Sequence, residues 1–219
     1  MNKKIEGELL ADRAQAALWN AFRAGTLREG EFLSISQLVD LLDSPIAAVR
    51  DAVKHAGSKG LLIALPKRGL RVMEANPESI RRCLDYRMVL DTAGAVRRIE
   101  AGNMDGLDLI KAEHADLLTV AKSDRTGGMP QRAIKTDLTL HDFLARGLGN
   151  SLLTDDYETN RLRIAIIQNA RPFLRDRIVS AMEEHLAIIA ALEAGDPIAA
   201  AETIRVHFNQ TLRWWGVTP

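Results

Sequence analysis

Residues 34–60 have the sequence SISQLVDLLDSPIAAVRDAVKHAGSKG, and this stretch decides the fold of the N-terminal part of the chain. Ser34 and Gln37 have the spacing of a capping box, in which each side chain satisfies a backbone amide, so a short helix is expected over 35–42. The pair Ser44-Pro45 supplies an N-cap and a proline suited to a first helical turn, which predicts a second helix ending near residue 58. Two helices separated by two or three residues have the spacing of a helix-turn-helix.

The segments on either side complete a winged domain. Apolar residues at three- and four-residue spacings predict a helix over 10–23, before this pair of helices. After the pair, short apolar runs at 61–65 and 70–73 flank Pro66-Lys67-Arg68-Gly69, whose proline and glycine predict a turn. A hairpin with a basic tip directly after a helix-turn-helix is a wing. Residues 1–75 are therefore predicted to form a winged helix-turn-helix, DNA-binding domain.

The remainder of the chain, residues 76–219, is predicted to be helical. Residues 74–79 contain Asn76-Pro77 and are expected to form a linker. No strand-like alternation follows, and helical patterns separated by glycine or proline cover 78–101, 105–123, 131–147, 151–170, 172–194 and 197–215. The predicted fold class is mostly α, a winged helix-turn-helix followed by an antiparallel all-α helical bundle.

Composition limits the classes of protein that the chain can be. Its 219 residues are enough for two modest domains, and no uncharged apolar run is long enough to span a bilayer, so no membrane partner is expected. Glu6 and Glu8 stand where a signal peptide would be apolar, which favours a cytoplasmic location. Cys83 is the single cysteine, which excludes an internal disulfide, and it is expected to be a small buried residue.

The net charge of zero conceals a basic segment. Between Ser44 and Met73 there are six lysines and arginines and one acid, Asp51. Such a local surface suits contact with phosphates, although an ordinary solvated face is the alternative on charge alone.

The second helix of a helix-turn-helix enters the major groove with its first residues against base edges. Arg50 can pair with both acceptors of a guanine, and Ile46 or Ala47 can touch a thymine methyl group. Lysines and arginines farther along are better placed for phosphates. The residues expected to contact DNA are Pro45, Ile46, Ala47, Arg50, Lys54, Lys67, Arg68 and Gly69.

Over about residues 9–73 the chain resembles the GntR family of bacterial regulators. The resemblance is carried by a Gly-Thr-Leu-Arg-Glu-Gly turn, a leucine in the first motif helix, a Val-Arg-Asp-Ala-Val signature and a glycine- and leucine-rich wing: Gly25–Gly30, Leu38, Val49–Val53, Gly60-Leu61-Leu62 and Arg68-Gly69. The chain departs from the family where members commonly have Ser-Arg-x-Pro before the Val-Arg, because Ile46 replaces the arginine there. The family's usual operator sequence is therefore not carried over.

Histidines in the helical part form a candidate metal site. Asp137 and His141 are four positions apart, which places them on one face of a helix, and His185 and His207 lie in the middle of the last two helical segments. Three imidazoles and one carboxylate suit zinc, with nickel as the alternative, and would leave coordination positions for a ligand. On spacing alone the signal is weak, because a histidine on an amphipathic helix is more often a surface or hydrogen-bonded core residue.

The helical segments resemble the FCD ligand-binding domain of the FadR-type branch of these regulators. Metal-binding members have Asp-x-x-x-His on one helix and single histidines on the last two, and this chain has Asp137-Leu138-Thr139-Leu140-His141, His185 and His207. The resemblance implies that these four residues bind a divalent metal and that His55 and His114 do not. It also implies that Arg87 contacts the effector, where its planar fork suits a carboxylate; a salt bridge is the alternative.

The function expected from these patterns is ligand-responsive, DNA-binding regulation of transcription, with repression as the expected mode. The partners are an inverted-repeat operator, a second copy of the chain and a small carboxylate effector. The chain is not expected to be an enzyme. One alternative is a metal-dependent enzyme with a His/Asp site in a helical bundle, but the sequence contains no His-Glu-x-x-His motif. The other is a metal-dependent structural module that does not bind DNA.

Overall fold

The computed structural model describes residues 2–123, 129–171 and 173–218. The chain forms two compact units: unit 1 comprises Met1–Ser79 and Arg161–Arg171, and unit 2 comprises Ile80–Asn160 and Pro172–Pro219. Unit 1 contains the winged helix-turn-helix and unit 2 the helical bundle, which confirms the predicted fold class. The assignment of functions to residues 1–75 and 76–219 stays a prediction.

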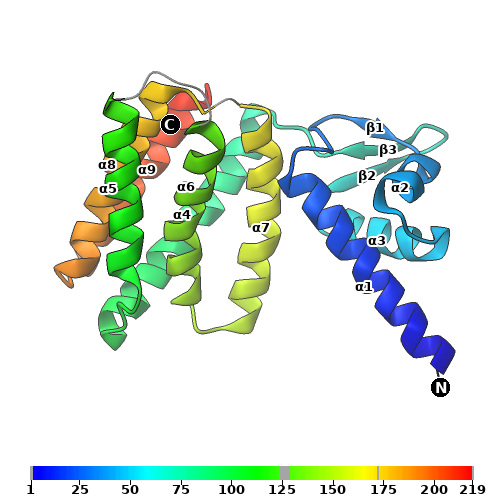
Figure 1. Cartoon of the computed structure of the whole chain (residues 1–219), viewed down its shortest axis with the longest axis horizontal. Helices are drawn as coiled ribbons and strands as arrows, with labels where there is room; N and C mark the ends of the chain where they lie inside the picture. The colour runs from blue at the N-terminus through cyan, green and yellow to red at the C-terminus, as the bar shows by residue number, and fades with distance from the viewer. Residues whose placement is uncertain (1, 124–128, 172, 219) are drawn as a thin grey trace. The chain divides into compact units, whose positions relative to one another are not determined.

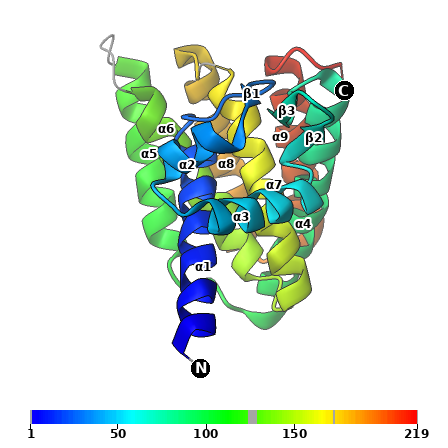
Figure 2. The same ribbon diagram turned by 90° about the vertical axis from the view of Figure 1, so that its right-hand side faces the viewer.

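Unit 1 is built around three helices and a small sheet (Figure 2). Its elements in chain order are α1 (Asn2–Arg23), β1 (Phe32–Leu33), α2 (Ile35–Leu42), α3 (Ile46–Ser58), β2 (Leu62–Leu65) and β3 (Gly69–Val72). The sheet is antiparallel with strand order β1-β3-β2. The sequence analysis predicted the β2–β3 hairpin, and β1 adds a third strand that it did not predict.

Glycine at the wing makes the third strand possible. Gly69 has φ +88°, and a Cβ atom at this position would lie 2.5 Å from the carbonyl oxygen of Leu33. Only glycine accommodates both the positive φ and the close backbone contact. β1 can therefore pair with β3 through Leu33 and Leu70.

The start of α2 is as predicted, whereas the predicted start of α3 is wrong. The hydroxyl of Ser34 accepts a bond from the Gln37 amide at 3.1 Å, and the Gln37 side chain accepts from the Ser34 amide at 2.8 Å. Pro45 occupies the N-cap position of α3 in an extended conformation. The hydroxyl of Ser44 donates to the carbonyl oxygen of Leu42 at 2.9 Å, so it serves the end of α2 and does not cap α3.

Unit 2 is an antiparallel bundle (Figure 1). The helices are α4 (Pro77–Ala101), α5 (Leu107–Ser123), α6 (Met129–Arg146), α7 (Ser151–Asn169), α8 (Arg175–Glu193) and α9 (Pro197–Trp214). They agree with the predicted segments to within a few residues. α4 begins at Pro77, inside the expected linker. The segment that corresponds to α8 was predicted to begin at Pro172, which lies outside the described residues. Among the described helices, none combines the length and apolarity that crossing a bilayer requires.

Two of the apolar clusters in this bundle have a polar layer between them. Along α8, Met182 belongs to one cluster and Ile188 to the other, and His185 lies between them. Along α5, His114 has the same position between Ile110 and Leu117. Buried polar side chains are costly unless they are paired, so the partners of this layer determine what it can do.

A close approach between α4 and α6 positions this layer. A Cβ atom on Gly94 of α4 would lie 2.1 Å from the carbonyl oxygen of Leu144 on α6, so only glycine fits. The two helix backbones can then approach closely enough for buried side chains of α4 to reach α6.

The helix α7 contributes to both units. In unit 2, the amide of Asn160 donates to the carbonyl oxygen of Cys83 at 2.8 Å. In unit 1, Arg163, Asn169 and Arg171 donate to the carbonyl oxygens of Lys59, Phe22 and Ala75 at 2.8, 2.9 and 3.0 Å. The last part of α7 and the residues after it thus satisfy backbone groups at the ends of α1 and α3 and before α4.

Candidate metal centre and nucleic-acid interface

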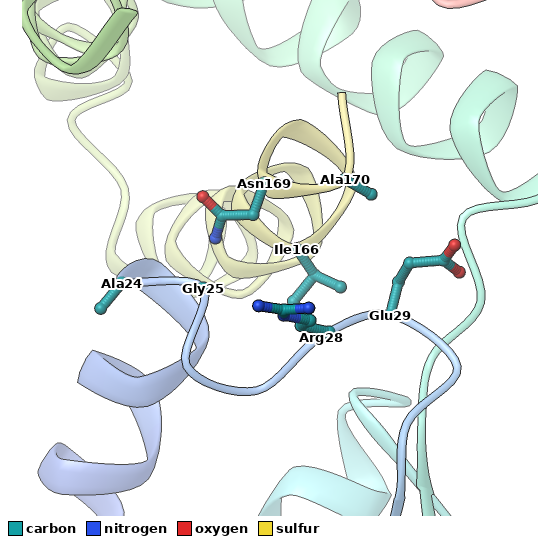
Figure 3. Close-up of a pocket in the computed structure, with 7 residues that line it drawn as sticks. All are labelled: Ala24, Gly25, Arg28, Glu29, Ile166, Asn169 and Ala170. Atoms are coloured by element: carbon teal, nitrogen blue, oxygen red, sulfur yellow. The ribbon is translucent and has the colours of Figure 1, made fainter. Parts of the chain in front are cut away.

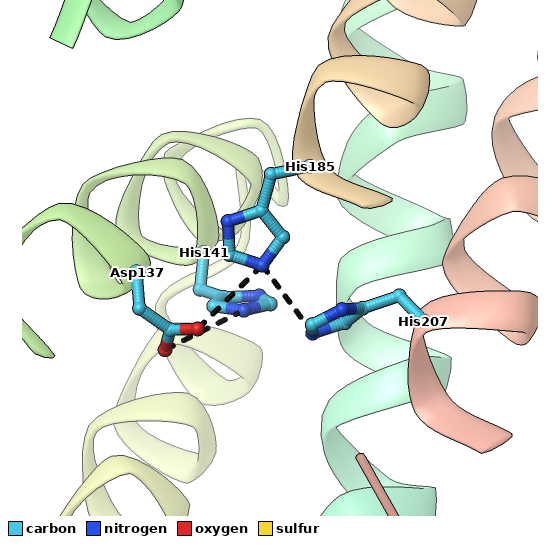
Figure 4. A group of neighbouring side chains, drawn as sticks. All are labelled: Asp137, His141, His185 and His207. Atoms are coloured by element: carbon cyan, nitrogen blue, oxygen red, sulfur yellow. Dashed lines mark hydrogen bonds and ion pairs between the residues drawn. The ribbon is translucent and has the colours of Figure 1, made fainter. Parts of the chain in front are cut away.

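The four residues proposed as metal ligands come together inside unit 2 (Figure 4). Asp137 and His141 project from α6, His185 from α8 and His207 from α9, and one potential ligand atom from each lies within 4.8 Å of all the others. All four side chains are buried. The helix periodicity that keeps residues four apart on one face explains why Asp137 and His141 meet.

The distances place three Nε2 atoms and one carboxylate around a common point. His185 Nε2 lies 3.5 Å from Asp137 Oδ1 and 3.4 Å from His207 Nε2. His141 Nε2 lies 3.9 Å from Asp137 Oδ2.

The outer nitrogen of His141 fixes its tautomer. His141 Nδ1 lies 2.8 Å from Oδ2 of Asp91, a buried residue of α4, and an ionised carboxylate can only accept. We therefore assign the proton to Nδ1, which leaves a lone pair on Nε2. In the described part of the chain this buried Nε2 has no hydrogen-bond partner, as expected of an atom reserved for a cation.

His207 is oriented in the same way. Its Nδ1 lies 2.7 Å from Oε2 of Glu184, and its Nε2 faces the guanidinium of Arg87, which can only donate, so Nε2 presents a lone pair. Glu184 is held in turn by Arg177, whose Nη1 donates to Oε1 at 2.8 Å. The buried Arg87 donates from Nη2 to Nε2 of His207 at 3.3 Å, and its Nε lies 3.9 Å from Asp91 Oδ2.

Burial keeps the imidazoles of His185 and His207 neutral. Burial holds the pKa of His185 and of His207 well below the usual value of 6.5, and neighbouring positive groups lower it further. Burial also raises the pKa of Glu184 to about 7, although Arg177 opposes that shift. Neutral rings with free Nε2 lone pairs and one carboxylate are the donor set of a divalent transition metal, so the residues present fit such an ion.

Sequence reasoning missed the residues that contact the Nδ1 atoms of the ligand histidines. Asp91, Glu184 and His114 all contact a ligand histidine through its Nδ1 atom. A signal was present for one of them, because His114 occupies a core-facing position of an otherwise apolar helix face. A polar residue at such a position needs a buried partner.

The residues expected to contact DNA lie in unit 1, on two neighbouring elements. Five of them, Pro45, Ile46, Ala47, Arg50 and Lys54, are exposed at the start and along the outer face of α3. The other three are also exposed: Lys67 and Arg68 in the turn between β2 and β3, and Gly69 at the start of β3. The opposite face of α3 is buried through Ala48, Val49, Ala52 and Ala56. α3 is thus packed on one side and leaves the candidate residues accessible.

Two other features of unit 1 are separate from these sites. His55 is half-buried, with Nδ1 2.6 Å from the side-chain oxygen of Gln15 and its ring edge-on to Trp19, which is a structural role. A pocket of about 450 Å³ is lined by Ala24, Gly25, Arg28, Glu29, Ile166, Asn169 and Ala170 (Figure 3). It contains no cluster of metal-ligating side chains, whereas the His/Asp cluster belongs to unit 2.

Fold and site together define a protein with a winged helix-turn-helix and a helical domain that encloses a buried His/Asp cluster. Residues 82–210 match the FCD domain family, and the chain belongs to that family. No curated protein sequence matches the chain.

Solved structures share the fold over nearly the whole length. McbR/YncC of E. coli is 17% identical, with a TM-score of 0.77 over 94% of this chain and 97% of that one. A putative transcriptional regulator GntR from Rhodococcus sp. RHA1 is 19% identical, with a TM-score of 0.72 over 95% and 99% of the two chains. The family match and these folds support a ligand-responsive regulator of the GntR type.

Proposed function

We propose that the protein regulates transcription by binding operator DNA through unit 1, in response to a divalent metal and a small carboxylate bound in unit 2. The observation that carries this proposal is the convergence of three imidazole lone pairs and the Asp137 carboxylate inside an FCD domain. The winged fold of unit 1, with its exposed basic residues, supports DNA as the partner and the cytoplasm as the location.

Zinc is the metal that this donor set favours, and nickel is the alternative. Asp137, His141, His185 and His207 would hold the ion, which would act as a Lewis acid and offer coordination positions to an oxygen ligand. Asp91 and Glu184 would orient His141 and His207, because a carboxylate on Nδ1 keeps Nε2 available.

Arg87 is the proposed contact for the effector. Its guanidinium group donates to the Nε2 lone pair of His207, the same lone pair that a metal would use. One lone pair cannot serve both, so metal binding would leave Arg87 without this acceptor. A buried cation next to a metal centre favours a carboxylate, which can accept both prongs of the guanidinium fork.

We expect Arg87→Met to weaken carboxylate binding to the zinc-loaded protein about tenfold or more, since hydrogen bonds to charged groups contribute about 1.5–3 kcal/mol. The measurement is the thermal shift of wild type and variant with a panel of small carboxylic acids, and the corresponding amides are the control ligands. Equal stabilisation of both proteins by the acids, or stabilisation of the wild type by amides alone, would show that Arg87 has no effector role.

The proposed DNA complex is a homodimer on an inverted repeat, because each chain offers one recognition helix and the symmetry of such proteins matches that of their operators. Arg50 is the proposed base contact, and Ile46 or Ala47 is the proposed contact to a thymine methyl group. Lys54, Lys67 and Arg68 are the proposed phosphate contacts.

We expect Arg50→Ala to weaken specific DNA binding by about 1–3 kcal/mol and to relax discrimination at one base pair. Lys67→Ala should weaken binding to all sequences alike and reduce the slope of affinity against salt by about one. Mobility shifts on the protein's own promoter region and on scrambled DNA, across salt concentrations, separate the two effects. An unchanged footprint with Arg50→Ala would mean that α3 does not read the bases.

Mobility shifts and a turnover assay test the two competing classes of protein. A metal-dependent structural module would not shift promoter DNA under any metal or ligand condition. A metal-dependent enzyme would turn over members of the carboxylate panel, and neither the exposed face of α3 nor the basic wing would serve that activity.

A further inference from the structure

We propose that His114 is a positioning residue that holds His185 in the tautomer needed to bind a metal. This inference rests on the proposed metal site and assigns a role to a histidine outside the four ligands. His114 lies on α5, a helix of the polar layer that contributes none of the four ligands, and its side chain is 0% exposed.

The first step is the proton on His114. Its Nδ1 lies 2.7 Å from the carbonyl oxygen of Ile110, one turn earlier on the same helix. A carbonyl oxygen only accepts hydrogen bonds, so Nδ1 must donate and carries the proton. The neutral ring has a single N–H, and its Nε2 is therefore an acceptor.

The second step is the proton on His185. Nε2 of His114 lies 3.1 Å from Nδ1 of His185, and the two rings are tilted with centroids 5.1 Å apart. Because His114 Nε2 accepts, His185 Nδ1 must donate. The remaining nitrogen, Nε2, then has a lone pair directed toward Asp137 and His207.

A hydrogen-bonded chain from the Ile110 carbonyl through His114 to His185 thus determines which nitrogen of His185 is free. The opposite tautomer would place a proton on Nε2, where it would block coordination. Each ligand histidine has such a partner, but His141 and His207 use carboxylates and His185 uses a neutral ring. The neutral ring controls the tautomer without adding another negative charge to a layer that contains Asp91, Asp137 and Glu184.

Two variants separate this role from simple packing. His114→Leu keeps an apolar side chain of related size but removes the acceptor, whereas His114→Gln can present an amide oxygen near the position of Nε2. His55→Leu is the matched control, because His55 is a structural histidine of unit 1. Mutation of a residue that hydrogen-bonds to a metal ligand typically lowers metal affinity about 10–100-fold.

The experiment is competition for zinc against a chelator, together with long-range ¹H–¹⁵N spectra of histidine-labelled protein without metal. We expect His185 of the wild type to be protonated on Nδ1, zinc affinity to fall about 10–100-fold in His114→Leu and to be largely restored in His114→Gln, and His55→Leu to bind zinc as the wild type does.

An Nε2-protonated His185 in the wild type, or unchanged zinc affinity in a folded His114→Leu, would overturn the role of His114. The wild-type spectrum gives this answer even where His114→Leu fails to fold. Failure of the metal site itself is a different result: the wild type would then bind no zinc although His185 is protonated on Nδ1, which overturns the proposed function and the role of His114 toward a metal with it.

Discussion

Protein carrying His185→Ala or His207→Ala is expected to lose nearly all of the metal that the wild type retains on purification. Each histidine supplies one of the four donors, and each projects from a helix that has no second ligand to replace it. Loss of a donor leaves three ligands and a cavity in a buried layer. Elemental analysis of the purified proteins measures the effect directly.

The control for this prediction is His55→Ala, which removes a histidine outside the His/Asp cluster found among the described residues and should leave the metal content unchanged. Near-stoichiometric metal in both His185→Ala and His207→Ala would defeat the assignment. Complete loss in His55→Ala would mean that unit 1 holds the ion.

Metal removal at pH 7.5 is expected to lower the melting temperature by about 10 °C, because an ion present at about a thousand times its Kd adds about 4 kcal/mol and each kcal/mol shifts a domain of this size by roughly 2–4 °C. The ion would link α6, α8 and α9, so its contribution is to the folded state. Thermal melts with and without a chelator give the difference.

This difference should disappear at a pH well below the ordinary histidine pKa of about 6.5, because burial lowers the pKa of His185 and His207 in the folded chain and protons compete with the metal only there. Burial lowers the pKa of His185 and His207 in the folded chain, so below that pH the unfolded chain binds protons that the folded chain does not. The free energy of unfolding therefore rises with pH between the lowered pKa values of the folded chain and about 6.5, and it falls on acidification, with or without metal.

Metal binding adds to the pH dependence of stability, because protons compete with the metal for the imidazoles of the ligand histidines. A variant with both His185→Ala and His207→Ala should show neither the effect of the chelator nor the extra acid sensitivity. A chelator effect that stays as large as at pH 8 down to the lowest pH at which the chain is still folded would contradict histidine ligation.

The helical elements could be predicted from the sequence because periodicity and caps are local signals. The Ser34–Gln37 capping box and the segments of the bundle depend on neighbours a few residues away, and the structure reproduces them. Strand β1 and the start of α3 were not predicted correctly. The pairing of β1 depends on β3, far along the chain, and the Ser44 hydroxyl had a competing acceptor at the end of α2.

The candidate metal centre was predictable for a different reason. Asp137 and His141 are linked by helix geometry, but their meeting with His185 and His207 depends on how three helices pack, and resemblance to a family supplied that step. The residues that contact the ligand histidines have no local signature beyond the core-facing position of His114. His114 is distinguished from an ordinary core histidine only by its 3.1 Å contact with His185, which no spacing along the chain reveals.

The division of α7 between the two units affects how the chain can be recombined. The polypeptide passes from one unit to the other near residues 79, 160 and 171, so a single cut does not separate them. A fragment ending at residue 79 would lack Arg163, Asn169 and Arg171 and would leave their carbonyl acceptors on Lys59, Phe22 and Ala75 to water. A chimera that exchanges the DNA-binding part with that of a relative should therefore carry residues 161–171 from the same parent.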